Sequence, residues 1–246
     1  MPDPIFADPR LAALYDILDD DRSDLDVYVE IIDELRAATV LDVGCGTGML
    51  ACMLARRGLE VIAIDPAAAS LDVARQKPGA EHVRWIHGDA ASVPPLGVDV
   101  AVMTANVAQV FVGDADWADA LRALRSAVRD DGWLVFETRD PQRRAWERWT
   151  KDATYRRLDV PDVGPVMTWI ELGEVDEPLV SFRHVFRFEA DGSELISDST
   201  IRFRDLEEIG ASLDEAGLQL RSVREAPDRP GLELVVFAQP SGRSLI

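Results

Sequence analysis

The sequence predicts an α/β fold with a doubly wound, seven-stranded and mostly parallel sheet. Apolar strand patterns alternate with amphipathic helix patterns over residues 39–138, and the same alternation returns over residues 205–246. Such alternation implies right-handed crossovers and a parallel sheet that helices cover on both faces. The seven expected strands lie at residues 39–43, 60–65, 82–86, 98–103, 133–137, 218–225 and 232–238.

Residues 139–204 follow a different pattern, which predicts an insertion after the fifth strand. From residue 166 onward, apolar side chains recur at every second position, and Asp191-Gly192 is a hairpin turn signal. We therefore expect a core domain of residues 1–138 and 205–246, and an inserted helix with a small antiparallel sheet. The insertion is expected to act as a lid, a substrate platform or the surface of a homodimer.

Helix signals place the remaining elements around the sheet. Apolar side chains at helical spacing, with Leu11 and Tyr15 among them, predict one N-terminal helix, and a second begins near Ser23 or Asp24 and includes Tyr28. Further helices are expected at residues 67–77, 114–131 and from Asp205 to Gly217. Both N-terminal helices precede the first strand, so they are expected to pack outside the sheet as cap helices.

Composition excludes several classes of protein. The formal net charge is 26 − 45 = −19, which disfavours contact with nucleic acid or an anionic membrane. The two cysteines, Cys45 and Cys52, lie too close together for a disulfide framework, and no Cys/His spacing fits a zinc site. No apolar run reaches the roughly 20 residues of a membrane helix, and the N-terminus lacks signal-peptide features. We therefore expect a cytoplasmic protein without a bound metal.

A glycine-rich turn after the first strand predicts a ligand site. Gly44, Gly46 and Gly48 allow a ligand to lie against the backbone, and the following helix directs free N–H groups toward it. An acid about 20 residues on, Asp65, is suited to bind ribose hydroxyls, a feature that two nucleotide-binding classes share. Asp42 before the turn would repel a pyrophosphate but attract a cation such as an amino acid's ammonium group.

The ordered motifs V-L-D-V-G-C-G-T-G, V-I-A-I-D-P-A, H-G-D-A and D-V-A-V-M-T-A-N-V resemble those of class I S-adenosylmethionine-dependent methyltransferases. The resemblance covers about residues 38–138. It implies S-adenosylmethionine as cofactor, with its methionine part near the glycine turn, its ribose at the second strand, its adenine at the third, and its sulfonium over the loop after the fourth. The cofactor-binding residues so implied are Asp42, Gly44, Cys45, Gly46, Asp65, Pro66, Asp89, Ala90, Asn106 and Val107.

The same resemblance implies methyl transfer to a small-molecule acceptor. Such a displacement requires alignment and exclusion of water, and it needs a general base only when the acceptor must lose a proton first. The catalytic residue is therefore not predicted. His184 is one candidate base, although its shared face with Phe182 and Phe186 favours a packed core histidine. Side chains expected to reach the acceptor are Tyr15, Tyr28, Gln109, Phe111, Arg143 and Arg144.

The segment 139–157 carries seven basic and three acidic residues, a net charge of 7 − 3 = +4 in an acidic chain. One hypothesis is that it binds an anionic acceptor, and the alternative is a helix whose arginines pair with neighbouring acids. Two other functions stay open: a non-enzymatic S-adenosylmethionine-binding regulator or partner subunit, and an NAD-dependent oxidoreductase. The glycine spacing and Asp42 disfavour the oxidoreductase.

Overall fold

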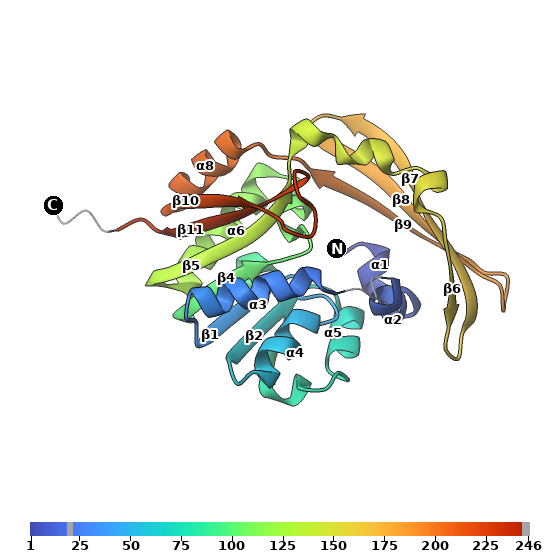
Figure 1. Cartoon of the computed structure of the whole chain (residues 1–246), viewed down its shortest axis with the longest axis horizontal. Coiled ribbons are helices and arrows are strands. Elements are labelled where there is room, and N and C mark those ends of the chain that lie inside the picture. The colour runs from blue at the N-terminus through green and yellow to red at the C-terminus, as the bar shows by residue number, and fades with distance from the viewer. Residues whose placement is uncertain (19–21, 243–246) are drawn as a thin grey trace.

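The computed structural model describes residues 1–18 and 22–242 and contains two β-sheets. A large sheet with helices on both faces forms one half of the molecule, and a small sheet curves over one of its edges (Figure 1). The N-terminal helices α1 (Pro4–Ala7) and α2 (Pro9–Leu18) lie between the two halves. No helix in the described ranges has the length and apolar content that a membrane span requires.

The large sheet confirms the predicted seven-stranded, mostly parallel architecture. Its strand order is β10-β11-β5-β4-β1-β2-β3, and only β11 runs antiparallel to its two neighbours. The strands are β1 (Thr39–Val43), β2 (Glu60–Asp65), β3 (Val83–His87), β4 (Val98–Met103), β5 (Val128–Arg139), β10 (Leu218–Glu225) and β11 (Glu233–Pro240).

Alternation along the strands divides the core into two apolar layers. On β1, Val40 packs into the layer beneath α3 (Asp24–Glu34) and α4 (Met49–Arg56). The next residue, Leu41, packs into the layer beneath α6 (Asp114–Ala127) and α8 (Leu206–Glu215). Both residues are fully buried, because β1 is a central strand of the sheet and helices cover both of its faces. Helix α5 (Ala68–Ala74) lies beside β2 and β3.

The inserted segment forms the predicted antiparallel sheet, in the order β6-β7-β8-β9. One face of β8 buries Val180, Phe186 and Phe188 as expected, while Arg183 and Arg187 lie on the other face. The strands are β6 (Arg156–Val160), β7 (Gly164–Asp176), β8 (Leu179–Phe188) and β9 (Glu194–Arg202). The division into a core and an insertion at residues 139 and 204 stays a prediction.

Three helical elements differ from their predicted bounds. Helix α6 ends at Ala127 and β5 begins at Val128, so Gly132 lies inside the strand instead of after the helix. A Cβ at Gly132 would meet the Asp99 carbonyl at 2.6 Å, which explains the glycine as a close approach of β4. Helix α5 is shorter than residues 67–77. The basic segment contains no long helix but three short turns: η4 (Pro141–Arg143), η5 (Ala145–Arg148) and α7 (Lys151–Thr154).

Hydrogen bonds tie the N-terminal helices to both halves of the molecule. Asp16 on α2 accepts from the Thr47 hydroxyl at 2.6 Å and pairs with Lys77 at the end of the α5 region. The Ile5 backbone N–H donates to the Ser197 hydroxyl on β9 at 3.0 Å. These contacts hold α1 and α2 over the carboxyl ends of the parallel strands. The two helices that were expected as caps therefore lie in different places: α2 lies above the strand ends, and α3 lies on a face of the sheet.

Candidate active site

A cavity of about 580 Å³ opens at the carboxyl ends of the parallel strands. Its walls come from the glycine turn after β1, the ends of β2 and β3, the loop after β4 and the N-terminal segment. This is the edge at which doubly wound sheets bind ligands. The cavity brings together most of the residues implied by the resemblance: Asp42, Gly44, Cys45, Gly46, Asp65, Pro66, Asp89, Ala90 and Val107.

The three glycines of the turn have different physical roles. All three have positive φ, at +68°, +53° and +74°. A Cβ at Gly44 would lie 2.6 Å from Val107, and a Cβ at Gly48 would lie 2.5 Å from the Trp85 ring. Gly46 has no neighbour within 4 Å of that position and faces the cavity. Gly44 and Gly48 therefore permit close packing, while Gly46 leaves backbone open to a ligand.

Asp42 is the most unusual group in the cavity wall. Its side chain is 1% exposed, and its Oδ1 atom has no hydrogen-bond partner in the described part of the chain. Burial, aided by the negative charge of Asp65, raises the pKa of Asp42 to about 7, against a lowering influence from the Ala51 backbone N–H. An unpaired buried carboxylate oxygen is costly, so this cavity is suited to a ligand that carries a donor, above all a cation.

Asp65 and Asp89 hold the rim of the cavity through backbone contacts. Asp65 accepts from the Gly46 N–H at 2.8 Å and from the Ala67 N–H at 2.7 Å, and burial raises its pKa. Asp89 is exposed and accepts from the Ser92 N–H at 2.9 Å, which caps the turn η2 (Ala90–Ser92). A carboxylate has about four acceptor positions, so both groups retain capacity for ligand hydroxyl or amino groups.

The loop after β4 forms the cavity floor in a strained conformation. Ala105 and Asn106 both have positive φ, at +51° and +60°, although neither is glycine. Val107 lines the cavity and begins the turn η3 (Val107–Val110). The Asn106 side chain does not line the cavity: its amide donates to Glu233 at 3.2 Å, and its backbone N–H donates to Glu137 at 2.9 Å. Asn106 therefore anchors the floor from behind.

A buried polar network extends behind this loop. The Tyr28 hydroxyl donates to Glu137, and the pKa values of both groups are raised, chiefly by burial. Arg139 pairs with Glu233 at 3.3 Å and donates to the Gln109 side chain at 2.8 Å. Tyr28 and Gln109, which were expected to reach the acceptor, thus support the floor from the far side. Neither lines the cavity.

The other predicted acceptor residues divide into two groups. Tyr15 and Phe111 line the cavity. Arg143 and Arg144 do not: they are half exposed, and they pair with Asp140 at 3.6 Å and with Glu147 at 2.7 Å. Their pairing matches the alternative interpretation of the basic segment, with short turns in place of a helix.

His184 is placed in the packed face of the small sheet. Its ring lies 4.2 Å from the Phe186 ring, and its Nε2 atom lies 2.7 Å from the Thr168 hydroxyl. Burial lowers its pKa to about 4, so the imidazole is neutral at pH 7. His184 lines neither this cavity nor the adjoining groove described below. The placement fits the packing interpretation better than a catalytic one.

Several lining residues were not predicted. Asp3, Phe6, Arg22 and Leu25 come from the N-terminal segment, and Thr200 comes from β9. No local pattern marks them, because they meet the cavity only through tertiary packing. Glu137, which lies behind the floor loop, did carry a signal: it is an acid near the carboxyl end of a parallel strand, as Asp42 and Asp65 are. In the described residues, no group of three or more His, Cys, Asp or Glu side chains is placed to hold a metal ion.

Comparison with known proteins agrees with this geometry. Residues 40–132 match the model of a methyltransferase domain. An uncharacterized methyltransferase of Mycobacterium bovis is 35% identical over 115 residues, which are 46% of this chain and 56% of that protein. The chain thus spans about half the length of the curated relatives it matches. Residues 40–132 thus match a methyltransferase domain, and the resemblance seen in the motifs is confirmed.

Two solved structures extend the likeness over nearly the whole chain. An S-adenosylmethionine-dependent methyltransferase from Clostridium acetobutylicum has a TM-score of 0.73 at 17% identity, covering 95% of this chain and 98% of that one. CalS10, an amino pentose methyltransferase from Micromonospora echinaspora with S-adenosylmethionine bound, has a TM-score of 0.69 at 21% identity, covering 88% and 92%. These similarities show that the chain shares its fold with S-adenosylmethionine-dependent methyltransferases.

Proposed function

We propose that this chain transfers a methyl group from S-adenosylmethionine to a small-molecule acceptor. The observation that carries the proposal is the unpartnered, buried carboxylate oxygen of Asp42, which faces a cavity built on the glycine turn. A pyrophosphate-bearing dinucleotide would meet repulsion at this position, whereas an amino acid's ammonium group supplies the missing donor. The match of residues 40–132 to a methyltransferase domain supports the same choice.

The residues present fit this cofactor. Asp42 would accept from its ammonium group, and the open backbone at Gly46 would let the methionine part lie close. Asp65 would accept from the ribose hydroxyls, and Asp89 and Ala90 would border the adenine. Val107 would form the floor. When bound, the cofactor supplies a methyl group activated by its sulfonium.

The chain's own contribution to the reaction is alignment and exclusion of water. Tyr15, Phe111 and the N-terminal segment line the cavity together with Thr200 of the small sheet, and an acceptor would approach along this wall. The floor loop is held rigidly by Glu137, so the approach direction is fixed by the fold. No side chain is assigned as a general base. We also place the protein in the cytoplasm, without a nucleic-acid or membrane partner, and suggest the insertion as the surface of a homodimer.

Thermal unfolding in the presence of cofactors tests the proposal. S-adenosylmethionine and S-adenosylhomocysteine at about 100 times their Kd should each add about 2.7 kcal/mol to the free energy of unfolding. For a chain of this size, that corresponds to a rise in Tm of roughly 5–10 °C. NAD should have no effect, and stabilisation by NAD alone would contradict the assignment. If S-adenosylmethionine binds but no S-adenosylhomocysteine forms when acceptor libraries are added, the alternative of a non-enzymatic regulator is supported instead.

A further inference from the structure

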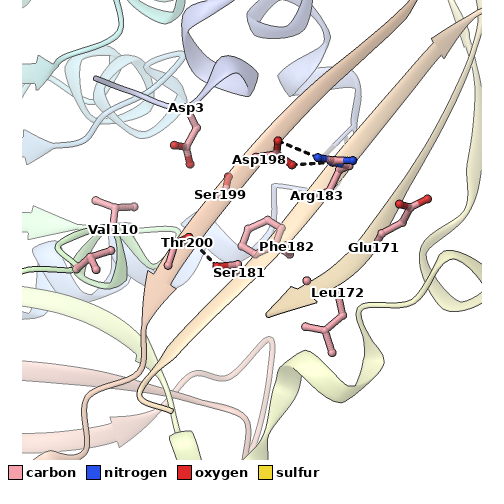
Figure 2. A pocket seen from close by; sticks show the side chains of 12 residues that line it. Asp3, Val110, Glu171, Leu172, Ser181, Phe182, Arg183, Asp198, Ser199 and Thr200 are labelled. Atoms are coloured by element: carbon pink, nitrogen blue, oxygen red, sulfur yellow. Dashed lines mark hydrogen bonds and ion pairs between the residues drawn. The ribbon is translucent and has the colours of Figure 1, made fainter. Parts of the chain in front are cut away.

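A second cavity joins the first and has no assigned role. It is a groove of about 620 Å³ that runs along the small sheet, and it shares Asp3, Val110 and Thr200 with the cofactor cavity. Figure 2 shows Asp3 and Val110 beside the edge strand β9, with groove side chains from β7, β8 and β9 standing on the sheet next to them. The shared residues make the groove continuous with the end of the cavity where an acceptor approaches.

The polar side chains of the groove are arranged in cross-strand pairs. The Ser181 and Thr200 hydroxyls lie 2.8 Å apart, and Arg183 pairs with Asp198 at 2.7 Å (Figure 2). Glu171, on the neighbouring strand, opposes Arg183 in the β7–β8 register. One arginine therefore faces two carboxylates, and Asp3 adds a third at the entrance. The groove offers hydroxyl groups and a surplus of negative charge.

The charge surplus extends through both cavities. Eight acidic residues line them, but only two basic ones, Arg22 and Arg183. Both arginines are already paired, with Asp24 at 3.1 Å and with Asp198. Among the described residues, neither cavity thus presents an uncompensated cation. An anionic acceptor would therefore be repelled. The basic segment 139–157 belongs to the same insertion but lines neither cavity. The eight acidic residues are Asp3, Asp42, Asp65, Asp89, Asp116, Asp119, Glu171 and Asp198.

We infer that this groove is the acceptor site and that the acceptor is a hydroxylated amine, bound with its nitrogen toward Asp3 and the cofactor cavity. The inference rests on the proposed function and specifies its substrate class. Hydroxyl groups of the acceptor would exchange hydrogen bonds with Ser181 and Thr200, and its ammonium form would be drawn to the carboxylates.

The reaction that follows is balanced without a further co-reactant. The bound ammonium group first loses one proton to water. The nitrogen lone pair then forms the new C–N bond while the electron pair of the C–S bond remains on sulfur, which leaves a neutral thioether and a methylated ammonium product. Because nearby carboxylates favour the ammonium form, the rate should rise with pH.

The test uses the full chain saturated with S-adenosylhomocysteine, whose binding is first measured by calorimetry. Three sets of small fragments share the same hydroxylated skeletons and carry an amine, an alcohol or a carboxylate. Saturation-transfer NMR should show the amines binding at least fivefold more tightly than the matching carboxylates. Carboxylates that bind as tightly as amines would overturn the inference.

Two matched variants locate the binding. Ser181→Trp fills the groove at a position that does not itself line the cofactor cavity, although its neighbour Thr200 does. Ile196→Trp adds the same ring to an exposed position of β9 outside the groove. Amine binding should weaken at least tenfold in the first and stay unchanged in the second, while both retain S-adenosylhomocysteine. Equal amine binding by the two variants would refute the assignment of the groove as the acceptor site. Failure of the wild type to bind S-adenosylhomocysteine would instead refute the proposed function.

Discussion

Two sets of buried carboxylates lie on opposite sides of the floor loop 104–107, and they differ in whether their oxygens have hydrogen-bond partners. On the cavity side, Asp42 keeps one oxygen without a partner. Behind the loop, Glu137 accepts from Tyr28 and Asn106, and Glu233 accepts from Asn106 and Arg229 and forms an ion pair with Arg139. Both sets are almost completely removed from solvent. Burial alone therefore does not distinguish a binding group from a structural one.

The difference lies in satisfaction of hydrogen-bonding capacity. Behind the loop both carboxylates are paired, although the Asn106 Oδ1 atom lacks a partner among the described residues. Such pairing fixes one arrangement of the carboxylates, which suits a loop that must hold two consecutive residues at positive φ. An unpaired oxygen destabilises the ligand-free protein and is compensated when a donor arrives. Changes in the two sets should therefore affect different quantities.

The largest effect is expected from Glu137→Ala. It leaves the Tyr28 hydroxyl and the Asn106 backbone N–H without a partner in a buried site, so the free energy of unfolding should fall by about 3 kcal/mol. Denaturant titration measures this. Glu194→Ala, which breaks the exposed pair with Arg187, is the control and should cost less than about 0.5 kcal/mol. Similar losses in both variants would show that the network does not hold the floor.

Asp42→Asn should produce the converse result. Loss of a charge-assisted hydrogen bond of about 2 kcal/mol should weaken S-adenosylhomocysteine binding roughly 30-fold. At pH 8 the ligand-free variant should be no less stable than the wild type, because it lacks the cost of a buried anion. Calorimetry and thermal unfolding measure the two quantities. A variant that loses stability yet binds normally would assign Asp42 to the structural set.

The pH dependence of the ligand-free protein sharpens the comparison further. The folded-state pKa of Asp42, about 7, lies above its ordinary value of 3.8, so between these values the native state holds a proton that the unfolded state has released. The contribution of Asp42 to stability is therefore full below about pH 4 and is lost as the pH rises toward 7. Subtracting the stability curve of Asp42→Asn from that of the wild type should reveal this slope. A flat difference would mean that the carboxylate is already compensated.

The smallest effect is expected from Arg143→Glu combined with Arg144→Glu. Both side chains are half exposed and pair only with nearby surface acids, so stability should change by less than about 1 kcal/mol. Affinity for S-adenosylhomocysteine should be unchanged. Loss of turnover with an anionic acceptor in this variant would revive the hypothesis that the basic segment binds substrate.

Local sequence patterns were sufficient to predict the cavity side of the floor loop 104–107. The order of strands, the turn at residues 44–48 and the acids at the ends of β1 and β2 are contiguous patterns, because backbone geometry and strand polarity dictate them directly. The start of β5 was missed because the helix signal of α6 runs past Ala127, whereas Val128 already pairs with Val98 on β4 and the charged residues 129–131 lie in the register shift before Trp133.

Local sequence patterns were insufficient to predict the paired carboxylates behind the floor loop or the groove on the small sheet. Asn106 contacts Glu137 and Glu233, which lie 31 and 127 positions further along the chain. A local pattern carries no information on such pairs. The groove likewise depends on how β7, β8 and β9 lie against residues 3 and 110. Each of these sites arises from packing between segments that are distant in the sequence.

Proton release on cofactor binding tests the central claim most directly. Calorimetry of S-adenosylhomocysteine binding at pH 6.5, in two buffers of different ionisation enthalpy, measures the protons exchanged. Because Asp42 is mostly protonated at that pH in the ligand-free protein and would be ionised beside an ammonium group, the wild type should release between about half a proton and one proton. In Asp42→Asn the release should disappear. Binding without proton release, or an unchanged release in the variant, would contradict the role of Asp42.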